Sequence, residues 1–251
     1  MEIVLTIAGS DPSGGAGIQQ DLRTIESLGC YGASVITALT TQNTLGVQSV
    51  MPVPADVVRS QLEAILSDLD VKAIKIGQIP SADVANVIAE TLHQHLTPIT
   101  HHPIILDPVM ISTSGRRLMS EDAIDVVVSE LFPLCALITP NIPEMETLSA
   151  LPGFDARKYN LLIKGGHAEG SEMADRLCLA NGTERVYATE RINSTNLHGT
   201  GCALSSAIAS SLALGYSLEE SVAKGKAYVT EAIRRGKNLG IGHGNGPVFY
   251  K

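Results

Sequence analysis

Residues 3–17, IVLTIAGSDPSGGAG, decide the fold. Residues 3–8 are a short apolar run typical of a buried strand, and the residues that follow form a glycine-rich loop. A helical pattern then begins at about Gly17 and continues to Leu28. A buried strand that passes through a glycine loop into a helix predicts the first unit of an α/β protein with a parallel sheet.

The same alternation continues along the whole chain. Strands are expected at residues 3–8, 34–39, 73–76, 103–106, 136–139 and 160–164, and a hairpin at residues 176–180 and 186–189. Helices are expected at residues 17–28, 54–69, 81–95, 120–131, 145–151, 201–214 and 218–235. No linker, low-complexity tract or repeat interrupts the pattern. We therefore expect one domain over residues 1–251, an α/β fold whose mostly parallel sheet is flanked by helices on both faces.

Composition excludes several classes of function. The net charge of −8 and the absence of a Lys/Arg cluster with interleaved aromatics argue against a nucleic-acid partner. No run approaches the about 20 apolar residues of a membrane span, and the N-terminus does not resemble a signal peptide. The four cysteines have no paired spacing, which predicts reduced thiols in a cytoplasmic protein: they are Cys30, Cys135, Cys178 and Cys202.

A second glycine turn, His198-Gly199-Thr200-Gly201-Cys202, opens directly into the helix expected at residues 201–214. Free N–H groups and the dipole of such a helix N-terminus attract an anion such as phosphate. The same field predicts that Cys202 favours the thiolate. By itself the turn fits a cysteine hydrolase or a transferase, and we interpret His198 as structural.

Polar motifs follow nearly every expected strand. Ligands of open α/β sheets bind outside the carboxyl ends of the strands, so these motifs should meet at one edge. They are residues 9–11, 40–43, 77–78, 107–110, 139–141 and 164–167. The loop from Gly9 to Gly17 matches neither the dinucleotide fingerprint nor the Walker-type loop. It is either a tight turn or a backbone surface close to a small substrate.

Several of these polar residues have two interpretations. Asp21 is either a buried acceptor for a substrate group or an exposed helical aspartate. The amide of Gln42 can read a heterocycle edge through both its donor and its acceptor, or it can belong to a turn. Asn141 and Glu144 can hold hydrated Mg²⁺ or form a capping box. Lys164 can contact a phosphate or be a surface lysine before a turn.

Together these motifs resemble the ribokinase-like small-molecule kinases, and more narrowly the hydroxymethylpyrimidine/phosphomethylpyrimidine kinases of thiamin biosynthesis. The resemblance runs over nearly the whole chain in the family's order. It rests on residues 6–19, 35–39, 42–44, 75–77, 106–110, 139–141, 164–167, 196–202 and 246–248.

The resemblance implies a three-layer ribokinase-like fold and a homodimer. It implies a kinase that uses ATP and Mg²⁺ to phosphorylate 4-amino-5-hydroxymethyl-2-methylpyrimidine and then its monophosphate. The implied substrate-binding residues are Gly9, Asp21, Gln42, Gln78 and Val109, with Gln42 reading the edge of the pyrimidine ring.

The catalytic turn implied by the resemblance is Gly199, Thr200, Gly201 and Cys202, whose N–H groups surround the transferred phosphoryl group. Cys202 stands where many relatives carry an aspartate base, and it is a candidate proton acceptor or an orienting group. Phosphoryl transfer requires mainly positioning and charge stabilisation, so a helix dipole, a metal and a lysine suffice.

The residues implied to hold ATP and its phosphates are Asp107, Thr139, Asn141 and Lys164. Mg²⁺ is assigned to Glu144 and, through water, to Asp107. The sequence does not indicate how the adenine is held.

Two features depart from the family. Gln78 stands where the family commonly has methionine against the substrate ring. Only a short segment, residues 152–159, separates the helix at residues 145–151 from the next strand, where the family usually has a further helix. Either the crossover is completed by the first helix alone, or a segment is missing between Leu151 and Asn160, which a break in the chain would reveal.

Two other functions remain open at this point. A pyridoxal kinase has the same fold, although pyridoxal-selective relatives tend to differ at Gln42. A catalytically silent pyrimidine-binding domain would not need the phosphate-side residues Asp107, Asn141 and Lys164.

Overall fold

A computed structural model describes residues 1–95, 102–112, 114–165 and 172–249. The described residues form a nine-stranded sheet in the order β3-β2-β1-β4-β5-β6-β7-β8-β9. The six central strands β2, β1, β4, β5, β6 and β7 pair in parallel. Strand β3 pairs antiparallel with β2, β8 with β7, and β9 with β8. Their bounds are β1 Ile3–Ser10, β2 Tyr31–Asn43, β3 Gly46–Pro52, β4 Val71–Ile76, β5 Ile104–Leu106, β6 Leu137–Ile138, β7 Leu161–Ile163, β8 Glu172–Cys178 and β9 Glu184–Glu190.

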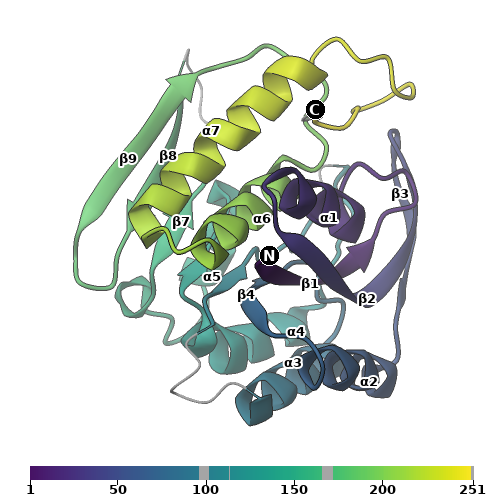
Figure 1. The fold of residues 1–251 in the computed structure, drawn as a ribbon, viewed down its shortest axis with the longest axis vertical. Coiled ribbons are helices and arrows are strands. Elements are labelled where there is room, and N and C mark those ends of the chain that lie inside the picture. The colour runs from purple at the N-terminus through teal and green to yellow at the C-terminus, as the bar shows by residue number, and fades with distance from the viewer. Residues whose placement is uncertain (96–101, 113, 166–171, 250–251) are drawn as a thin grey trace.

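Two layers of helices enclose the sheet, as expected for the three-layer α/β fold (Figure 1). One layer contains α2 (Ala55–Leu66), α3 (Ala82–His95), α4 (Glu121–Val126) and α5 (Ile142–Ser149). The other contains α1 (Gly17–Ser27), α6 (Thr200–Ala213) and α7 (Leu218–Gly236).

Each central strand supplies both layers because successive side chains point to opposite faces. In β5, Ile104 and Leu106 pack with α2, α3 and α4, whereas Ile105 packs with α6 and α7. In β7, Leu161 and Leu162 divide in the same way. Burial on both faces explains why the central strands are continuous apolar runs in the sequence.

The largest correction concerns the second strand. Residues 40–43 were expected to follow a strand ending at Leu39, but they lie inside β2, which continues to Asn43 and turns back as β3. The two strands pair antiparallel from Ala38 with Pro52 to Asn43 with Gly46. This hairpin is mostly exposed, so its sequence lacks the apolar run by which the buried strands were predicted.

Other expectations need smaller corrections. The helix expected at residues 54–69 ends at Leu66, and the one expected at residues 120–131 changes after Val126 into a π-helical segment, Val127–Leu131. Between Leu151 and Asn160 a short 3₁₀ turn, Ala156–Lys158, leads into β7. The parallel crossover from β6 to β7 is made by α5 and this turn. No helix among the described residues is long and apolar enough to span a membrane.

Candidate active site

A cavity of about 430 Å³ lies at the carboxyl ends of the central strands. Every residue predicted for the site lines this cavity except Asp21 and Thr139, which are fully buried beneath it. The lining residues predicted from the sequence are Gly9, Gln42, Gln78, Asp107, Val109, Asn141, Glu144, Lys164, Gly199, Thr200, Gly201 and Cys202. The expected convergence of the strand-end motifs is therefore observed. Gly166 and His167, which belong to one of those motifs, lie outside the described residues.

The N-terminus of α6 forms one wall of the cavity. Gly199 precedes it in the left-handed conformation, with φ of 82°, and a Cβ there would collide with the carbonyl oxygen of Gly15. A Cβ on Gly201 would lie 3.0 Å from Oδ2 of Asp107. These two glycines let the helix end approach both the loop after β1 and the carboxylate after β5, so residues 199–202 line the cavity.

Cys202 behaves differently from the prediction that the helix terminus favours its thiolate. Burial raises the pKa of Cys202 to about 11, although Lys75 and a hydrogen bond from the backbone of Gly17 act in the opposite direction. Asp21 and Asp107 add to the increase. The thiol is therefore protonated at neutral pH, because burial and the carboxylates outweigh the field of the helix.

A sealed ion pair lies beneath Cys202. Nζ of Lys75 in β4 is 2.9 and 2.8 Å from the two carboxylate oxygens of Asp21 in α1, and both side chains are fully buried. Asp21 also accepts hydrogen bonds from Thr6 at 2.6 Å and from Ser206 at 2.8 Å. With these donors in place, Asp21 supports the floor of the site and does not face the substrate cavity.

A second ion pair borders the cavity. Nζ of Lys164, just after β7, is 2.6 Å from Oδ1 of Asp107 and 4.0 Å from Oε2 of Glu144. Thr139 donates to the same Asp107 oxygen at 3.2 Å. Burial opposes the charge on Lys164, yet Asp107 and Glu144 raise the pKa of Lys164 above its usual value. A lysine between two carboxylates at the mouth of a cavity can contact an incoming phosphate.

Asn141 and Glu144 form the capping box that was one of their two interpretations. The side chain of Asn141 accepts from the N–H of Glu144 at 2.8 Å, and the carboxylate of Glu144 accepts from the N–H of Asn141 at 2.8 Å. Burial raises the pKa of Glu144 to about 7, with Lys164 opposing the shift and Asp107 adding to it. Capping does not remove Glu144 from the cavity wall.

Gln78 and Gly9 lie in contact where the substrate ring was expected. A Cβ on Gly9 would collide with Oε1 of Gln78, so glycine is required for the amide to lie against β1. The backbone carbonyl of Gln78 accepts from Thr37 at 2.6 Å, which fixes its main chain. Its Nε2 is buried and has no hydrogen-bond partner in the described structure.

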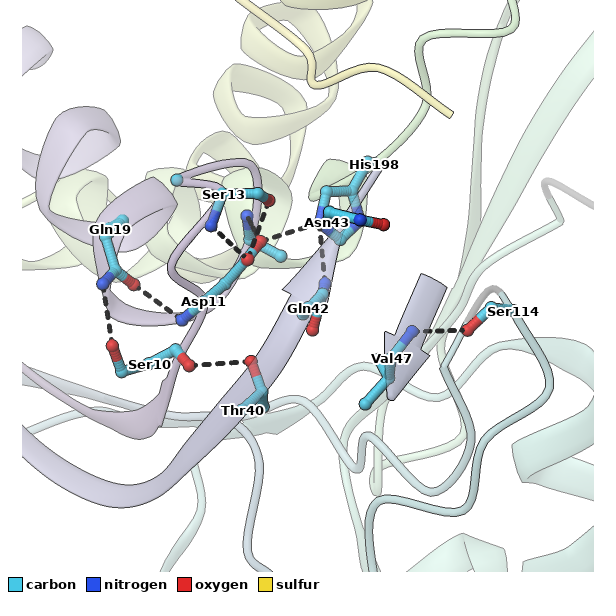
Figure 2. Close-up of polar contacts among 12 residues, drawn as sticks. Ser10, Asp11, Ser13, Gln19, Thr40, Gln42, Asn43, Val47, Ser114 and His198 are labelled. Carbon is cyan, nitrogen blue, oxygen red and sulfur yellow. Dashed lines mark hydrogen bonds and ion pairs between the residues drawn. The ribbon is translucent and has the colours of Figure 1, made fainter. Parts of the chain in front are cut away.

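Gln42 contacts His198, which in turn contacts Asp11 (Figure 2). Nε2 of Gln42 is 3.0 Å from Nε2 of His198, and that ring nitrogen is 2.8 Å from Oδ2 of Asp11. Asp11 belongs to the loop after β1, and Gln42 to the extended end of β2. Asp11 belongs to the strand-end motif at residues 9–11 and His198 to the second glycine turn, but neither was predicted as a site residue. Their contact spans 187 positions of the sequence.

The other half of the cavity was missed by the sequence predictions. It is formed by β8, the segment after β9, and α7, and includes Met173, Val229 and Ile233 as apolar wall residues. Asp175 accepts from the N–H of Gly165 at 3.0 Å and pairs with Lys226 at 2.8 Å. One signal was available in the sequence, because Lys226 lies on the buried face of α7 among apolar residues such as Val222 and Val229.

Lys75 was also missed, although its position carried a signal. It is a charged residue inside a strand, Val71–Ile76, whose neighbours on either side are buried isoleucines. A lysine is almost never fully buried unless it is paired, so its presence there predicts an acidic partner.

Comparisons with known proteins cover almost the whole chain. A family model for phosphomethylpyrimidine kinase matches residues 11–249. The hydroxymethylpyrimidine/phosphomethylpyrimidine kinase of Rhizobium meliloti is 43% identical over 262 residues, covering 99% of this chain and 96% of that protein. The thiamine biosynthesis bifunctional protein ThiED of Geobacter sulfurreducens is 44% identical over 254 residues, covering 96% of this chain and 51% of that longer protein.

Two solved structures are similar in fold. The crystal structure of the phosphomethylpyrimidine kinase of Clostridium difficile has a TM-score of 0.77 and 40% identity, and covers 93% of this chain and 100% of its own. The ADP complex of Bacillus subtilis pyridoxal kinase has a TM-score of 0.87 and 30% identity, and covers 99% and 97%. Identity is thus higher to the pyrimidine kinase, whereas the backbone superposes more closely on the pyridoxal kinase.

Proposed function

The chain belongs to the phosphomethylpyrimidine kinase family, and we propose that its cavity carries out two successive phosphoryl transfers in thiamin biosynthesis. ATP is the phosphate donor. The first acceptor is the hydroxyl of 4-amino-5-hydroxymethyl-2-methylpyrimidine, and the second is the phosphate of the resulting monophosphate. One observation carries this proposal: the amide of Gln42, the helix end at Gly199–Gly201 and the Asp107–Lys164 pair all line one cavity.

The α6 terminus is proposed to stabilise the transferred phosphoryl group. The N–H groups of Gly201 and Cys202 lie in the first turn of α6, where helix geometry leaves donors free and the dipole favours negative charge, whereas the N–H of Thr200 donates to the carbonyl of Leu197 at 3.3 Å. Lys164 lies 3.6 Å from the position of a Cβ on Gly201, so its ammonium group is next to this helix end. A preorganised dipole and a fixed positive charge are the main contributions a protein makes to phosphoryl transfer.

The residues on the phosphate side fit a hydrated Mg²⁺. No group of three or more His, Cys, Asp or Glu side chains placed to hold a metal is found among the described residues. Mg²⁺ does not need such a cage, because it keeps several waters and takes further ligands from substrate phosphates. We assign it to Glu144 and, through water, to Asp107. When bound there it would neutralise charge on the phosphates of ATP.

Cys202 is proposed to orient the acceptor hydroxyl as a neutral thiol. Its raised pKa disfavours the thiolate-base alternative at neutral pH. The loose transition state of phosphoryl transfer makes little demand on a base, so the hydroxyl proton can pass to an oxygen of the transferred phosphoryl group late in the reaction, as ADP leaves. No covalent intermediate on sulfur is required.

The nucleotide is proposed to lie between β8, the segment after β9, and α7. Met173, Val229 and Ile233 provide an apolar surface suited to an adenine ring, and Lys226 and Asp175 close its base. This placement brings the phosphates of ATP toward Lys164 and the α6 terminus. The ADP complex of the similar pyridoxal kinase supports a nucleotide site in this fold.

Two other functions are less well supported. A pyridoxal kinase is favoured by the close superposition on the Bacillus subtilis enzyme, but the sequence is more similar to the pyrimidine kinases. A non-catalytic pyrimidine-binding domain is disfavoured, because it would not need Asp107, Lys164 and the α6 terminus around one space.

We further propose that residues 1–251 act as a single domain, that the protein is cytoplasmic and that it forms a homodimer. One continuous sheet from β3 to β9 supports the single domain. The exposed apolar side chains Leu39, Leu45 and Met51 on the β2–β3 hairpin are suited to contact a second copy.

A coupled ADP-release assay tests the activity with the pyrimidine alcohol and pyridoxal as competing acceptors. We expect a higher kcat/KM for the pyrimidine alcohol, with ADP released in proportion to acceptor consumed. ADP release no faster than without acceptor would contradict the kinase assignment, and a higher kcat/KM for pyridoxal would favour the alternative.

A further inference from the structure

The carboxylate of Asp11 is surrounded by donors. Its Oδ1 accepts from the N–H of Ser13 at 2.9 Å and from the hydroxyl of Ser13 at 2.7 Å. Its Oδ2 accepts from the N–H of Ala16 at 2.9 Å and lies 2.8 Å from Nε2 of His198. Burial acts to raise the pKa of Asp11, yet these hydrogen bonds hold it below the usual value. The charged carboxylate of Asp11 therefore needs His198 to donate a hydrogen bond to it.

The imidazole of His198 has little freedom to avoid this requirement. Its backbone is fixed on both sides by the C-terminal segment, since its N–H donates to Gly246 and its carbonyl accepts from Val248. A Cβ on Gly15 would collide with the ring, which shows that the loop packs directly against it. With the ring held in place, the charge of Asp11 selects the tautomer that carries hydrogen on Nε2.

This tautomer determines how Gln42 is oriented. The Gln42 amide nitrogen lies 3.0 Å from the same Nε2, its one side-chain hydrogen-bond contact in the described structure. A ring nitrogen offers either a hydrogen or a lone pair, so Nε2 cannot donate to Asp11 and accept from Gln42 at once. With hydrogen on Nε2, that one hydrogen is shared between Asp11 and the Gln42 carbonyl oxygen, so the amide turns its oxygen to His198 and its NH₂ group away from the ring.

We propose that His198, held by Asp11, is a positioning residue that fixes the direction of the Gln42 amide and thereby selects an aminopyrimidine edge. This inference rests on the proposed function. An aminopyrimidine presents a ring-nitrogen acceptor beside an amino donor, and an amide with a fixed direction matches this order in one orientation of the ring. His198 also precedes Gly199, so the same residue links ring orientation to the start of the anion-binding turn.

The test compares two acceptors with opposite edges. The 4-amino alcohol has an acceptor at N3 and a donor at C4, whereas its 4-oxo analogue has a donor at N3 and an acceptor at C4. His198→Ala frees the Gln42 amide to turn. We expect the 4-amino to 4-oxo ratio of kcat/KM to fall by about tenfold or more, mainly through a higher KM for the 4-amino substrate.

His198→Gln is the conservative rescue. Its amide nitrogen carries two hydrogens, one for Asp11 and one for the Gln42 carbonyl, so the ratio should return to within about threefold of the original. Ser114→Ala is the matched control, because Ser114 bonds the N–H of Val47 at 3.3 Å and steadies the same hairpin without contacting Gln42. This control should leave the ratio unchanged.

Histidine ¹⁵N NMR of the unsubstituted protein examines the tautomer directly, with the His198 signal assigned by its loss in His198→Gln. Hydrogen on Nε2 supports the proposal, and hydrogen on Nδ1 alone overturns it. An unchanged ratio in a folded His198→Ala protein would also overturn it, as would a ratio that falls equally in Ser114→Ala. If the original protein phosphorylates neither acceptor, the proposed function itself has failed.

Discussion

Two lysine–aspartate pairs lie near the N-terminus of α6. They differ in burial and in the number of hydrogen bonds that the aspartate accepts. Lys75 and Asp21 are both fully buried, and Asp21 also accepts from Thr6 and Ser206. Lys164 is 16% exposed at the cavity wall, pairs with Asp107 and has Glu144 4.0 Å away.

The difference shows which pair can take part in chemistry. Phosphate can reach Lys164 without breaking a sealed network, because this lysine borders the cavity and is partly exposed. Lys75 also lines the cavity, but it is fully buried and both oxygens of Asp21 hold its ammonium group, so removing either residue leaves an uncompensated buried charge. Both pairs consist of the same two residue types, so residue identity alone does not distinguish the supporting pair from the reacting pair.

The largest expected effect is a loss of stability in Lys75→Met. The substitution leaves the Asp21 carboxylate buried without its cation, which costs about 3–5 kcal/mol in the free energy of unfolding. Denaturant unfolding measures it. Lys72→Met is the control, because Lys72 lies in the same strand but its pair with Asp70 is exposed, and it should unfold like the original. Equal stability of the two variants would contradict the sealed-pair interpretation.

Lys164→Met should lower catalytic activity more than stability, the reverse of Lys75→Met. We expect kcat to fall by about 10²–10³-fold, because a preorganised charge near the transferred phosphoryl group is lost. Thermal unfolding should change less than in Lys75→Met, since Lys164 is partly exposed and Asp107 keeps its bond from Thr139. A folded variant with nearly normal kcat would remove Lys164 from the phosphate site.

Cys202 lies between the two pairs and should have an intermediate effect. Cys202→Ala is expected to lower kcat by about tenfold or more while leaving pyrimidine binding largely in place. Because the pKa of Cys202 is raised from 9.0 to about 11, its contribution to stability is complete below pH 9 and is lost as the pH rises through 11.

The pH dependence of kcat distinguishes the two roles proposed for Cys202. A neutral thiol predicts no rise in kcat attributable to this residue between about pH 6 and 9, and Cys202→Ser should have a profile of the same shape. A rise near neutral pH that disappears in Cys202→Ser would identify a thiolate base.

The smallest expected effect is a gain in stability in Gln78→Met. Nε2 of Gln78 is buried without a partner, and an apolar side chain of similar length removes that unpaired donor. We expect the free energy of unfolding to rise by about 1 kcal/mol, measured by denaturant unfolding. A lower stability would mean that the Gln78 amide is satisfied through its contact with β1.

Much of the site could be predicted because parallel strands end at one edge. The strand-end positions of Asp107 and Lys164 were enough to bring them together, whereas Gln42 lines the same cavity from inside β2 and not from the strand end expected at Leu39. Asp21 shows the limit of that reasoning: burial was one of its two interpretations, but the hydrogen bonds that it accepts from Lys75, Thr6 and Ser206 depend on three distant segments.

The features that could not be predicted all depend on contacts made over long distances in the sequence. The pKa of Cys202 is set by burial and by the charges of Lys75, Asp21 and Asp107 on three segments, and the net result opposes the local helix field. The contact of Gln42 with His198 spans 156 positions. The nucleotide half of the cavity is made by β8, β9 and α7, whose sequences carry no compact motif.

The most direct test of the proposed activity is to follow the products of the pyrimidine alcohol and MgATP by ³¹P NMR. We expect the monophosphate to form first and then to be converted to the diphosphate, with both steps slowed by about 10²–10³-fold in Lys164→Met. Phosphorylation of pyridoxal but not of the pyrimidine alcohol, or a monophosphate that is never converted further, would contradict it.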